Sequence, residues 1–376
     1  MTDIRAVIAS RHRCGRTHAV TADGSINRPA TSTSPPTPLS SLGSIGFDRF
    51  VVGKADVMKA RPKVLFIAGA DRSGSTLLDV LLGSVNGFVA VGELSNIWQR
   101  GILEGRLCGC GCSLLTCDVW VDVLSSVLGH PPRSKDAQAV LSLRARSARV
   151  RHTRRILHSQ RPELGRYLAI LSRLYAAIAH RTNSAVIVDS SKDPSDAAAL
   201  ALTPGVDAFI VHLVRDPRAV AFSRRRRAKV QPDTPEPTRM AERSVSRATV
   251  DWLAWNLGTE VVTRTIPERS MLLRYEDFIR FPEEATARLV RLVDGSEPAL
   301  PFSGPDEAIV DVSHTVSGNP SRFTRGTVRL SVDDEWIVRQ PVRDRILSTA
   351  IAAPLMIRYG YPLYDVGADR VRSRRG

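Results

Sequence analysis

Short runs of apolar and β-branched residues recur along the chain from residue 63 onward, with longer segments of helical character between them. These runs predict five strands, over residues 63–69, 88–92, 185–190, 207–214 and 270–275. Helices are predicted near 75–83, 118–128, 138–158, 162–181, 194–202, 217–228, 240–264 and 282–293. Because strands alternate with helices, the pattern predicts an α/β fold, with a parallel sheet flanked by helices on both faces.

The segment 138–181 is long, helical in pattern and rich in arginine, and it falls between two predicted strands. It is therefore predicted to be a helical insertion in the α/β domain. Two interpretations of this insertion are open. It could form a cap over a binding site at the sheet, or it could be a solvated pair of helices without contact to a substrate.

The first 60 residues differ in composition from the rest. The tract at 31–41, TSTSPPTPLSS, offers little apolar surface to bury, so we expect residues 1–60 to be a disordered extension. Met58 directly precedes the first predicted strand, and we hypothesise that it is the true or an alternative start. The predicted domain spans 61–366, and a basic tail follows over 367–376.

A glycine-rich loop follows the first strand, with the sequence GADRSGST at residues 69–76. Gly69, Gly74 and Thr76 have the spacing of a nucleotide P-loop, so the fold is expected to resemble that of the P-loop NTPases. Such a loop binds an anion through backbone N–H groups and the positive end of the following helix. Ser75 occupies the position of the usual lysine, and Arg72 lies inside the loop instead. The missing lysine disfavours a standard ATP or GTP site.

A second segment, DAFIVHLVRD at 207–216, is an apolar strand that ends in charged residues. Arg215 stands at its carboxyl end, where open α/β sheets bind their ligands. Ser223 follows eight residues later, on the next predicted helix. Arg215 taken alone could also simply close the strand with a solvated charge.

Together, RSGSTLL at 72–78 and the spacing of Arg215 and Ser223 resemble the sulfotransferases that use 3′-phosphoadenosine 5′-phosphosulfate (PAPS). The match is closest to the carbohydrate and protein-tyrosine branch and to bacterial members. The resemblance implies that the loop holds the 5′-phosphosulfate, while Arg215 and Ser223 hold the 3′-phosphate. The loop residues that it implies for backbone N–H contacts to the nucleotide are Ser73, Gly74, Ser75, Thr76 and Leu77.

Three side chains are candidates for the chemistry of sulfuryl transfer, which depends mainly on positioning and electrostatic stabilisation. Arg72 would stabilise the leaving phosphate. Glu93, at the end of the second strand, is implied by the resemblance to be the general base, and Lys192, after the third strand, to be catalytic. The simpler alternatives are a helix N-cap or surface carboxylate for Glu93 and a turn-capping lysine for Lys192. The predicted transfer requires no metal.

The segment 314–323, HTVSGNPSRF, is punctuated by glycine and proline and is predicted to be a loop. In bacterial sulfotransferases a similar loop folds over the nucleotide, which implies a position near the 3′-phosphate for Arg322. His314 could be a second base or ordinary polar surface.

Four cysteines fall within ten residues, with Trp120 just after them: Cys108, Cys110, Cys112 and Cys117. Such density suggests zinc, but the spacing C-x-C-x-C-x₄-C differs from that of the usual C-x₂-C pairs. Many bacterial sulfotransferases have a similar stretch, which implies a family feature near the acceptor pocket. No metal ligand is therefore assigned from the sequence, and the purpose of the cysteines stays open.

Composition narrows the remaining choices. The chain has a net charge of +15, which is compatible with nucleic acid as a partner, but only 6% of its residues are aromatic and the basic residues are scattered arginines. We expect a small-molecule or glycan acceptor and no nucleic acid, with a carbohydrate, glycolipid or small metabolite preferred. No transmembrane run or secretory signal is visible, so a cytoplasmic protein is predicted. The resemblance implies a bacterial one. The alternatives are a P-loop kinase and a non-enzymatic polyanion or nucleic-acid binder, and the oligomeric state is not specified.

Overall fold

The computed structural model describes residues 61–225, 230–231, 233, 238–239, 242–297 and 299–364. The predicted extension over 1–60, with the hypothesis about Met58, and the predicted basic tail over 367–376 lie outside these residues. Within them, no helix is both long enough and apolar enough to cross a membrane.

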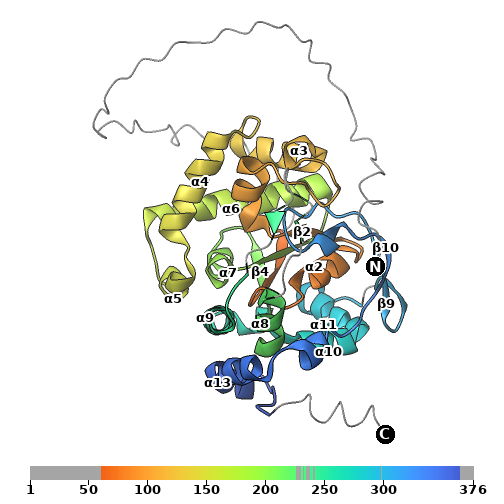
Figure 1. The fold of residues 1–376 in the computed structure, drawn as a ribbon. Coiled ribbons are helices and arrows are strands. Elements are labelled where there is room, and N and C mark those ends of the chain that lie inside the picture. Colours follow the sequence, from red (N-terminus) through yellow and green to blue (C-terminus); the bar gives the residue numbers. More distant parts are fainter. Residues whose placement is uncertain are drawn as a thin grey trace, which may run out of the picture. The chain divides into compact units, whose positions relative to one another are not determined.

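Five parallel strands form the central sheet, and all of them were predicted (Figure 1). They are β1 (Lys63–Ala68), β2 (Phe88–Gly92), β3 (Val186–Lys192), β4 (Asp207–Val214) and β7 (Ser270–Arg274). Their order across the sheet is β2-β3-β1-β4-β7. Strand β1 pairs in parallel with β3 and with β4. Parallel neighbours cannot be joined by a tight turn, so the chain must cross over between them, and the predicted helices form these connections.

The sheet is buried on both faces because alternate residues of β1 pack into different cores. Val64 and Phe66 join one core, and Leu65 and Ile67 join the other. The first core is covered by α3 (Asp118–Leu128), α4 (Ser134–Ser147), α6 (Pro162–Thr182) and α7 (Pro194–Ala201). The second is covered by α2 (Ser75–Gly83), α10 (Tyr275–Arg280) and α11 (Pro282–Asp294). The predicted α/β architecture with helices on both faces is confirmed.

The helical insertion lies between β2 and β3, as predicted, but its first helix is divided. The predicted helix over 138–158 consists of α4, a 3₁₀ turn at Val150–His152 and α5 (Thr153–Ile156). The break is at Ala148, which is buried and has an extended backbone. No glycine or proline marks this break, so the local sequence carries no signal for it.

Short helical turns also flank the strands and loops. The 3₁₀ turns are Leu94–Asn96, Leu114–Thr116, Pro267–Arg269 and Pro320–Phe323, and Ile97–Leu103 is a π-helix. Two short strands, β5 (Val230–Gln231) and β6 (Thr238–Arg239), form an antiparallel pair.

The C-terminal third contains elements that the sequence pattern did not predict. A small antiparallel sheet has the order β10-β9-β8, built from β8 (Phe302–Gly304), β9 (Glu307–Val310) and β10 (Gly326–Arg329). Two helices follow, α12 (Glu335–Arg339) and α13 (Val342–Arg358). Helix α13 packs against α8 (Pro217–Arg225) and α9 (Val245–Thr263), in a core that includes Val220, Trp252 and Met356.

Candidate active site

The loop between β1 and α2 has the backbone that a phosphate-binding loop requires. Gly69 has a φ of +135°, and a Cβ there would lie 2.2 Å from the carbonyl oxygen of Leu213. Gly74, the N-cap of α2, has a φ of +91°, and its Cβ would lie 2.5 Å from the Tyr275 ring. A side chain at Gly69 would therefore require a backbone shift, and one at Gly74 would require the Tyr275 ring to move and would strain the backbone. Both glycines are therefore needed to bring the loop against β4 and to begin α2 at the carboxyl edge of the sheet.

The backbone of the loop is also strained at its cation. Among the described residues, three non-glycine residues have a left-handed φ: Arg72 (70°), Asn183 (50°) and Lys192 (70°). Asn183 is the C-cap of α6, a usual place for this conformation. Arg72 and Lys192 are two of the predicted catalytic residues. Strained backbone of this kind costs about 1–3 kcal/mol per residue and gathers at functional sites.

Glu93 and Lys192 form an ion pair between the ends of β2 and β3. The Lys192 ammonium donates to Glu93 Oε1, and both side chains are largely buried. The second carboxylate oxygen, Oε2, accepts from Asn96 Nδ2 at 2.7 Å and from Arg100 Nη1 at 2.9 Å. Glu93 stands at the N-cap of the turn that follows, but its side chain makes no capping bond. It is therefore neither a capping nor a surface carboxylate.

The capping function predicted as an alternative for Lys192 belongs to its neighbour. Asp193 is the N-cap of α7 and accepts from the backbone N–H of Ser195 at 2.8 Å. Lys192 instead points back to the site, where its ammonium also lies 3.8 Å from Asp71 Oδ1 in the loop. Asp71 in turn pairs with Arg224 of α8. Four segments of the chain thus meet through charged side chains at one edge of the sheet.

The electrostatic surroundings shift the pKa of Glu93 strongly. Burial acts to raise the pKa, but the charges of Lys192 and Arg100, with hydrogen bonds from Lys192 and Asn96, outweigh it and lower the pKa to about 2. Glu93 is therefore ionised in this arrangement, and as long as Lys192 holds it, its basicity is weak. Burial, with the nearby charge of Arg224, lowers the pKa of Arg72.

We expect the Glu93 ion pair to contribute stability that depends on pH. Because the pKa falls from 4.5 to about 2 on folding, the contribution is complete above about pH 4.5 and is lost as the pH falls toward 2. Linkage sets its upper limit at about 3 kcal/mol. Urea unfolding of wild type and Glu93→Gln measures it. The stability difference between the two proteins is expected to shrink from neutral pH to about pH 3. A difference that does not change over this range would contradict the assignment.

Arg215 follows the carboxyl end of β4, lies beside the loop and is 5% exposed. Its Nη1 donates to the carbonyl oxygen of Arg72 at 3.1 Å, and its guanidinium lies 4.3 Å from the centre of the Tyr275 ring. Its Nη2 contacts Asp333, at 3.1 Å from the carboxylate. Arg215 is thus not a solvated charge at a strand end, since it already holds an anionic group next to the loop. Ser223 is half-buried on the following helix, α8.

The C-terminal loop crosses the phosphate-binding loop. The backbone N–H of Asn319 donates to Thr76 Oγ1 at 3.2 Å, and Gly318 approaches the same side chain. Ser317 Oγ accepts from Arg100 Nη1 at 2.6 Å, which connects this loop to the arginine that holds Glu93. The predicted loop therefore lies over the site.

Arg322, which is predicted to lie near the 3′-phosphate, is held by protein acceptors in this structure. Its guanidinium donates to the carbonyl oxygens of Thr315 and Leu107, both at 2.7 Å, and to Asp233 Oδ2 at 3.0 Å. The side chain is 2% exposed. These contacts make Arg322 an anchor of the C-terminal loop, and its contact with a phosphate stays a prediction.

The predicted loop residues differ in how their polar groups are used. The Ser73 hydroxyl is buried and has no hydrogen-bond partner among the described residues. The Leu77 N–H, predicted to face the nucleotide, donates to the Gly74 carbonyl oxygen at 3.1 Å. Ser75 is buried in the first turn of α2. The loop thus holds one buried, unsatisfied hydroxyl next to the residues predicted to bind the nucleotide.

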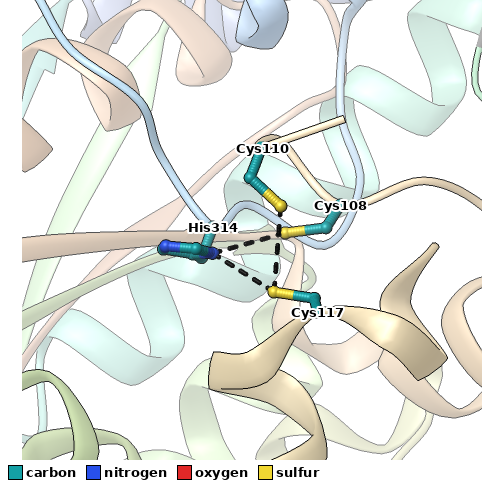
Figure 2. Close-up of side chains that lie close together, drawn as sticks. All are labelled: Cys108, Cys110, Cys117 and His314. Carbon is teal, nitrogen blue, oxygen red and sulfur yellow. Dashed lines mark hydrogen bonds between the residues drawn. The ribbon is translucent and has the colours of Figure 1, made fainter. Parts of the chain in front are cut away.

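His314, which could be a second base or ordinary polar surface, is half-buried and has sulfur neighbours. It lies against three of the four clustered cysteines (Figure 2). Four side chains form this group, which we call the Cys₃His cluster: Cys108, Cys110, Cys117 and His314.

Sequence reasoning missed three residues that complete the site: Asp71, Arg100 and Arg224. Asp71 stands inside the loop and Arg224 next to Ser223, so their positions carried a weak signal. Arg100 lies on the π-helix, which the pattern did not predict. It contacts Glu93, seven residues before it, and Ser317, which lies 217 residues after it in the C-terminal loop.

Two sulfotransferase domains are among the solved structures to which the chain is similar. The sulfotransferase domain from the Synechococcus PCC 7002 olefin synthase is 20% identical, with 83% of this chain and 99% of that chain covered and a TM-score of 0.46. The sulfotransferase domain from the curacin biosynthetic pathway is 16% identical, with 81% of this chain and 100% of that chain covered and a TM-score of 0.43. Both sequence identities and both TM-scores are low.

The sequence comparison is more direct. The model of the sulfotransferase family matches residues 62–296, which is more than half of the chain and includes all five strands of the central sheet. No protein with curated annotation matches the sequence significantly.

Proposed function

The chain belongs to the sulfotransferase family, and on this premise we propose that it transfers a sulfuryl group from PAPS to an acceptor hydroxyl. One observation carries the proposal. Arg72 and Lys192, both on strained left-handed backbone, flank the buried carboxylate of Glu93 at the carboxyl edge of the sheet. A pair of cations beside a carboxylate suits a reaction that moves an anionic group and removes a proton.

The residues around the loop fit a donor with phosphate groups at both ends. The start of α2 and the unpartnered Ser73 hydroxyl suit the 5′-phosphosulfate. Arg215 and Ser223 are proposed to bind the 3′-phosphate. The contact of Arg215 with the Asp333 carboxylate supports this, because a guanidinium that holds one anion at this place could hold another.

In the proposed reaction the acceptor oxygen forms a bond to sulfur while the bond from sulfur to the phosphate oxygen breaks. Glu93 takes the acceptor's proton, and 3′-phosphoadenosine 5′-phosphate (PAP) leaves with the bonding electron pair. Arg72 stabilises the charge that develops on the leaving phosphate, and Lys192 the charge on the sulfuryl oxygens. These cations supply the positive charge, so the proposed transfer needs no metal.

The ion pair between Glu93 and Lys192 orders the proposed steps, because the donor must bind before Glu93 becomes an effective base. With Lys192 on the carboxylate, the pKa of Glu93 is about 2 and the carboxylate is a weak base. If Lys192 turns toward a sulfuryl group, Glu93 loses the main charge that lowers its pKa, and its basicity rises. We therefore propose that the donor activates the base.

The acceptor is proposed to be a hydroxyl on a carbohydrate, glycolipid or small metabolite. A hollow of about 460 Å³ under α4 offers a place for it, because its lining includes Asp193, which adjoins Lys192. Gln99, Arg144 and Arg149 also line the hollow. The other half of the lining is apolar, from Leu141, Ala145, Ala148 and Val150, so the hollow suits an acceptor that has both polar and apolar surface.

Calorimetric titration with PAP tests the proposed donor. We expect PAP to bind the wild type without added Mg²⁺, and to bind Arg215→Ala about 10- to 100-fold more weakly, because a hydrogen bond to a charged group contributes about 1.5–3 kcal/mol. Arg269→Ala is the matched control. Arg269 lies at the opposite edge of the sheet, where it pairs with Asp207 on the surface. ATP and AMP are titrated in parallel. Binding of ATP as tight as that of PAP would contradict the proposal and favour a kinase.

A further inference from the structure

The Cys₃His cluster gathers four potential metal ligands from two distant segments of the chain. Three cysteines come from the loop before α3, and His314 comes from a loop 197 residues after Cys117. The ligand atoms all lie within 4.8 Å of one another. In Figure 2 the three sulfurs and the imidazole ring face a common point. Cys108 and Cys117 are buried, and the other two side chains are half-buried.

Three of the six distances between ligand atoms are close to those of a tetrahedral zinc site. Zinc bonds of about 2.3 Å to sulfur and about 2.0–2.1 Å to nitrogen separate two sulfurs by about 3.8 Å and a sulfur from a nitrogen by about 3.6 Å. The sulfurs of Cys110 and Cys117 are 3.8 Å apart. His314 Nδ1 lies 3.3 Å from the sulfur of Cys117 and 3.7 Å from that of Cys108.

The backbone around the cluster holds these ligands in place. Trp120 Nε1 donates to the carbonyl oxygen of His314 at 2.8 Å. The N–H of Gly109 donates to the carbonyl oxygen of Thr315 at 2.9 Å. The Cys108 N–H donates to the Cys112 carbonyl oxygen at 2.8 Å, which closes a turn around Cys110. The ligand positions are thus fixed by contacts that do not involve the thiols.

From this geometry we propose that one zinc ion binds in the Cys₃His cluster and fastens the C-terminal loop to the cysteine loop. Three thiolates and an imidazole favour zinc over magnesium or calcium, which prefer oxygen ligands. Four protein ligands fill a tetrahedral shell and leave no position for a substrate, so the ion is structural rather than catalytic. Cys112, whose thiol is not part of the cluster, takes no part in binding.

The spacing of the cysteines did not indicate this site, because a C-x-C-x-C-x₄-C run lacks the usual pairs. The fourth ligand comes from the loop that crosses the active site. Ser317 and Asn319, three and five residues after His314, contact Arg100 and Thr76. An ion at the cluster would therefore hold the loop that covers the phosphate-binding residues.

The metal content of the full-length protein tests the proposal. Protein purified under reducing conditions without chelator is expected to carry about one zinc ion per chain by elemental analysis and native mass spectrometry. Cobalt added to metal-depleted protein is expected to give the ligand-field bands of a tetrahedral, thiolate-bound ion. Folded protein that carries no zinc and gives no such bands would overturn the proposal. So would a disulfide between Cys110 and Cys117 found in protein purified in this way.

Matched variants locate the ligands. Cys117→Ser and His314→Ala are expected to lose the bound zinc, whereas Cys112→Ser keeps it in full. Circular dichroism shows whether each variant is folded. If a ligand variant does not fold, the cobalt spectrum of the wild type still decides the question. Zinc retained by a folded His314→Ala, or lost from a folded Cys112→Ser, would overturn the assignment.

Discussion

Replacing Glu93 by glutamine is expected to lower the turnover number by about 10²- to 10⁴-fold, the range that a general base contributes. Glutamine has nearly the same volume and cannot accept the acceptor's proton. The affinity for PAP is expected to stay within about threefold of wild type, because Glu93 is not proposed to contact the nucleotide. PAP release from PAPS in the presence of a panel of hydroxyl acceptors measures turnover, and calorimetry measures affinity.

Glu104→Gln is the matched control for this variant. Glu104 also forms an ion pair with an arginine, Arg106, but is more exposed than Glu93. It is expected to keep wild-type turnover. Full turnover in Glu93→Gln would remove Glu93 as the base. A loss of PAP affinity that equals the loss of turnover would instead show that the carboxylate supports the structure of the donor site.

Replacing Lys192 by alanine is expected to lower turnover by about 10²- to 10³-fold, the cost of removing one group that stabilises transition-state charge. The variant has a second, independent signature. Lys192 is the main charge that lowers the pKa of Glu93, so its removal raises that pKa. The remaining activity is therefore expected to fall at a higher pH on the acid side than that of wild type. The pH profile of kcat/KM tests this shift.

Lys63→Ala is the control for a lost lysine. Lys63 begins β1 at the opposite edge of the sheet and pairs with Asp294, at 2.8 Å on the surface. Exposed pairs of this kind contribute little, so wild-type turnover is expected. The double variant Glu93→Gln with Lys192→Ala is expected to lose less than the product of the two single losses, because the two residues act as a unit. An acid limb that does not move, or strictly multiplicative losses, would contradict the proposed coupling.

The zinc proposal is independent of these results. Its test measures metal content and spectra, so it can fail while the sulfotransferase mechanism stands. The reverse also holds, because a structural ion at the Cys₃His cluster requires no particular chemistry at Glu93 or Lys192.

The sequence alone determined the central sheet and the loop after β1. Residues of the central strands alternate between two apolar cores, so these strands read as short apolar runs, and such runs identified all five strands. The loop was recognisable because Gly69 and Gly74 satisfy backbone requirements that are local to the loop and its contacts. Arg72 lies in this loop, and Glu93, Lys192 and Arg215 stand at strand ends, which meet at the same edge of a parallel sheet. Their expected roles came from the resemblance to the sulfotransferases.

Tertiary structure alone decided how these residues are used. Packing against distant segments decides where the helix breaks at Ala148 and where the small C-terminal sheet and α13 form. Local propensity carries no information about this packing. The partners of Arg322 and the pKa of Glu93 depend on charges brought together by folding. The cysteines lacked a fourth ligand in sequence because His314 joins them only when the C-terminal loop crosses the sheet edge. Contacts between residues so far apart in the chain exist only in the folded state, so no pattern within one segment could predict them.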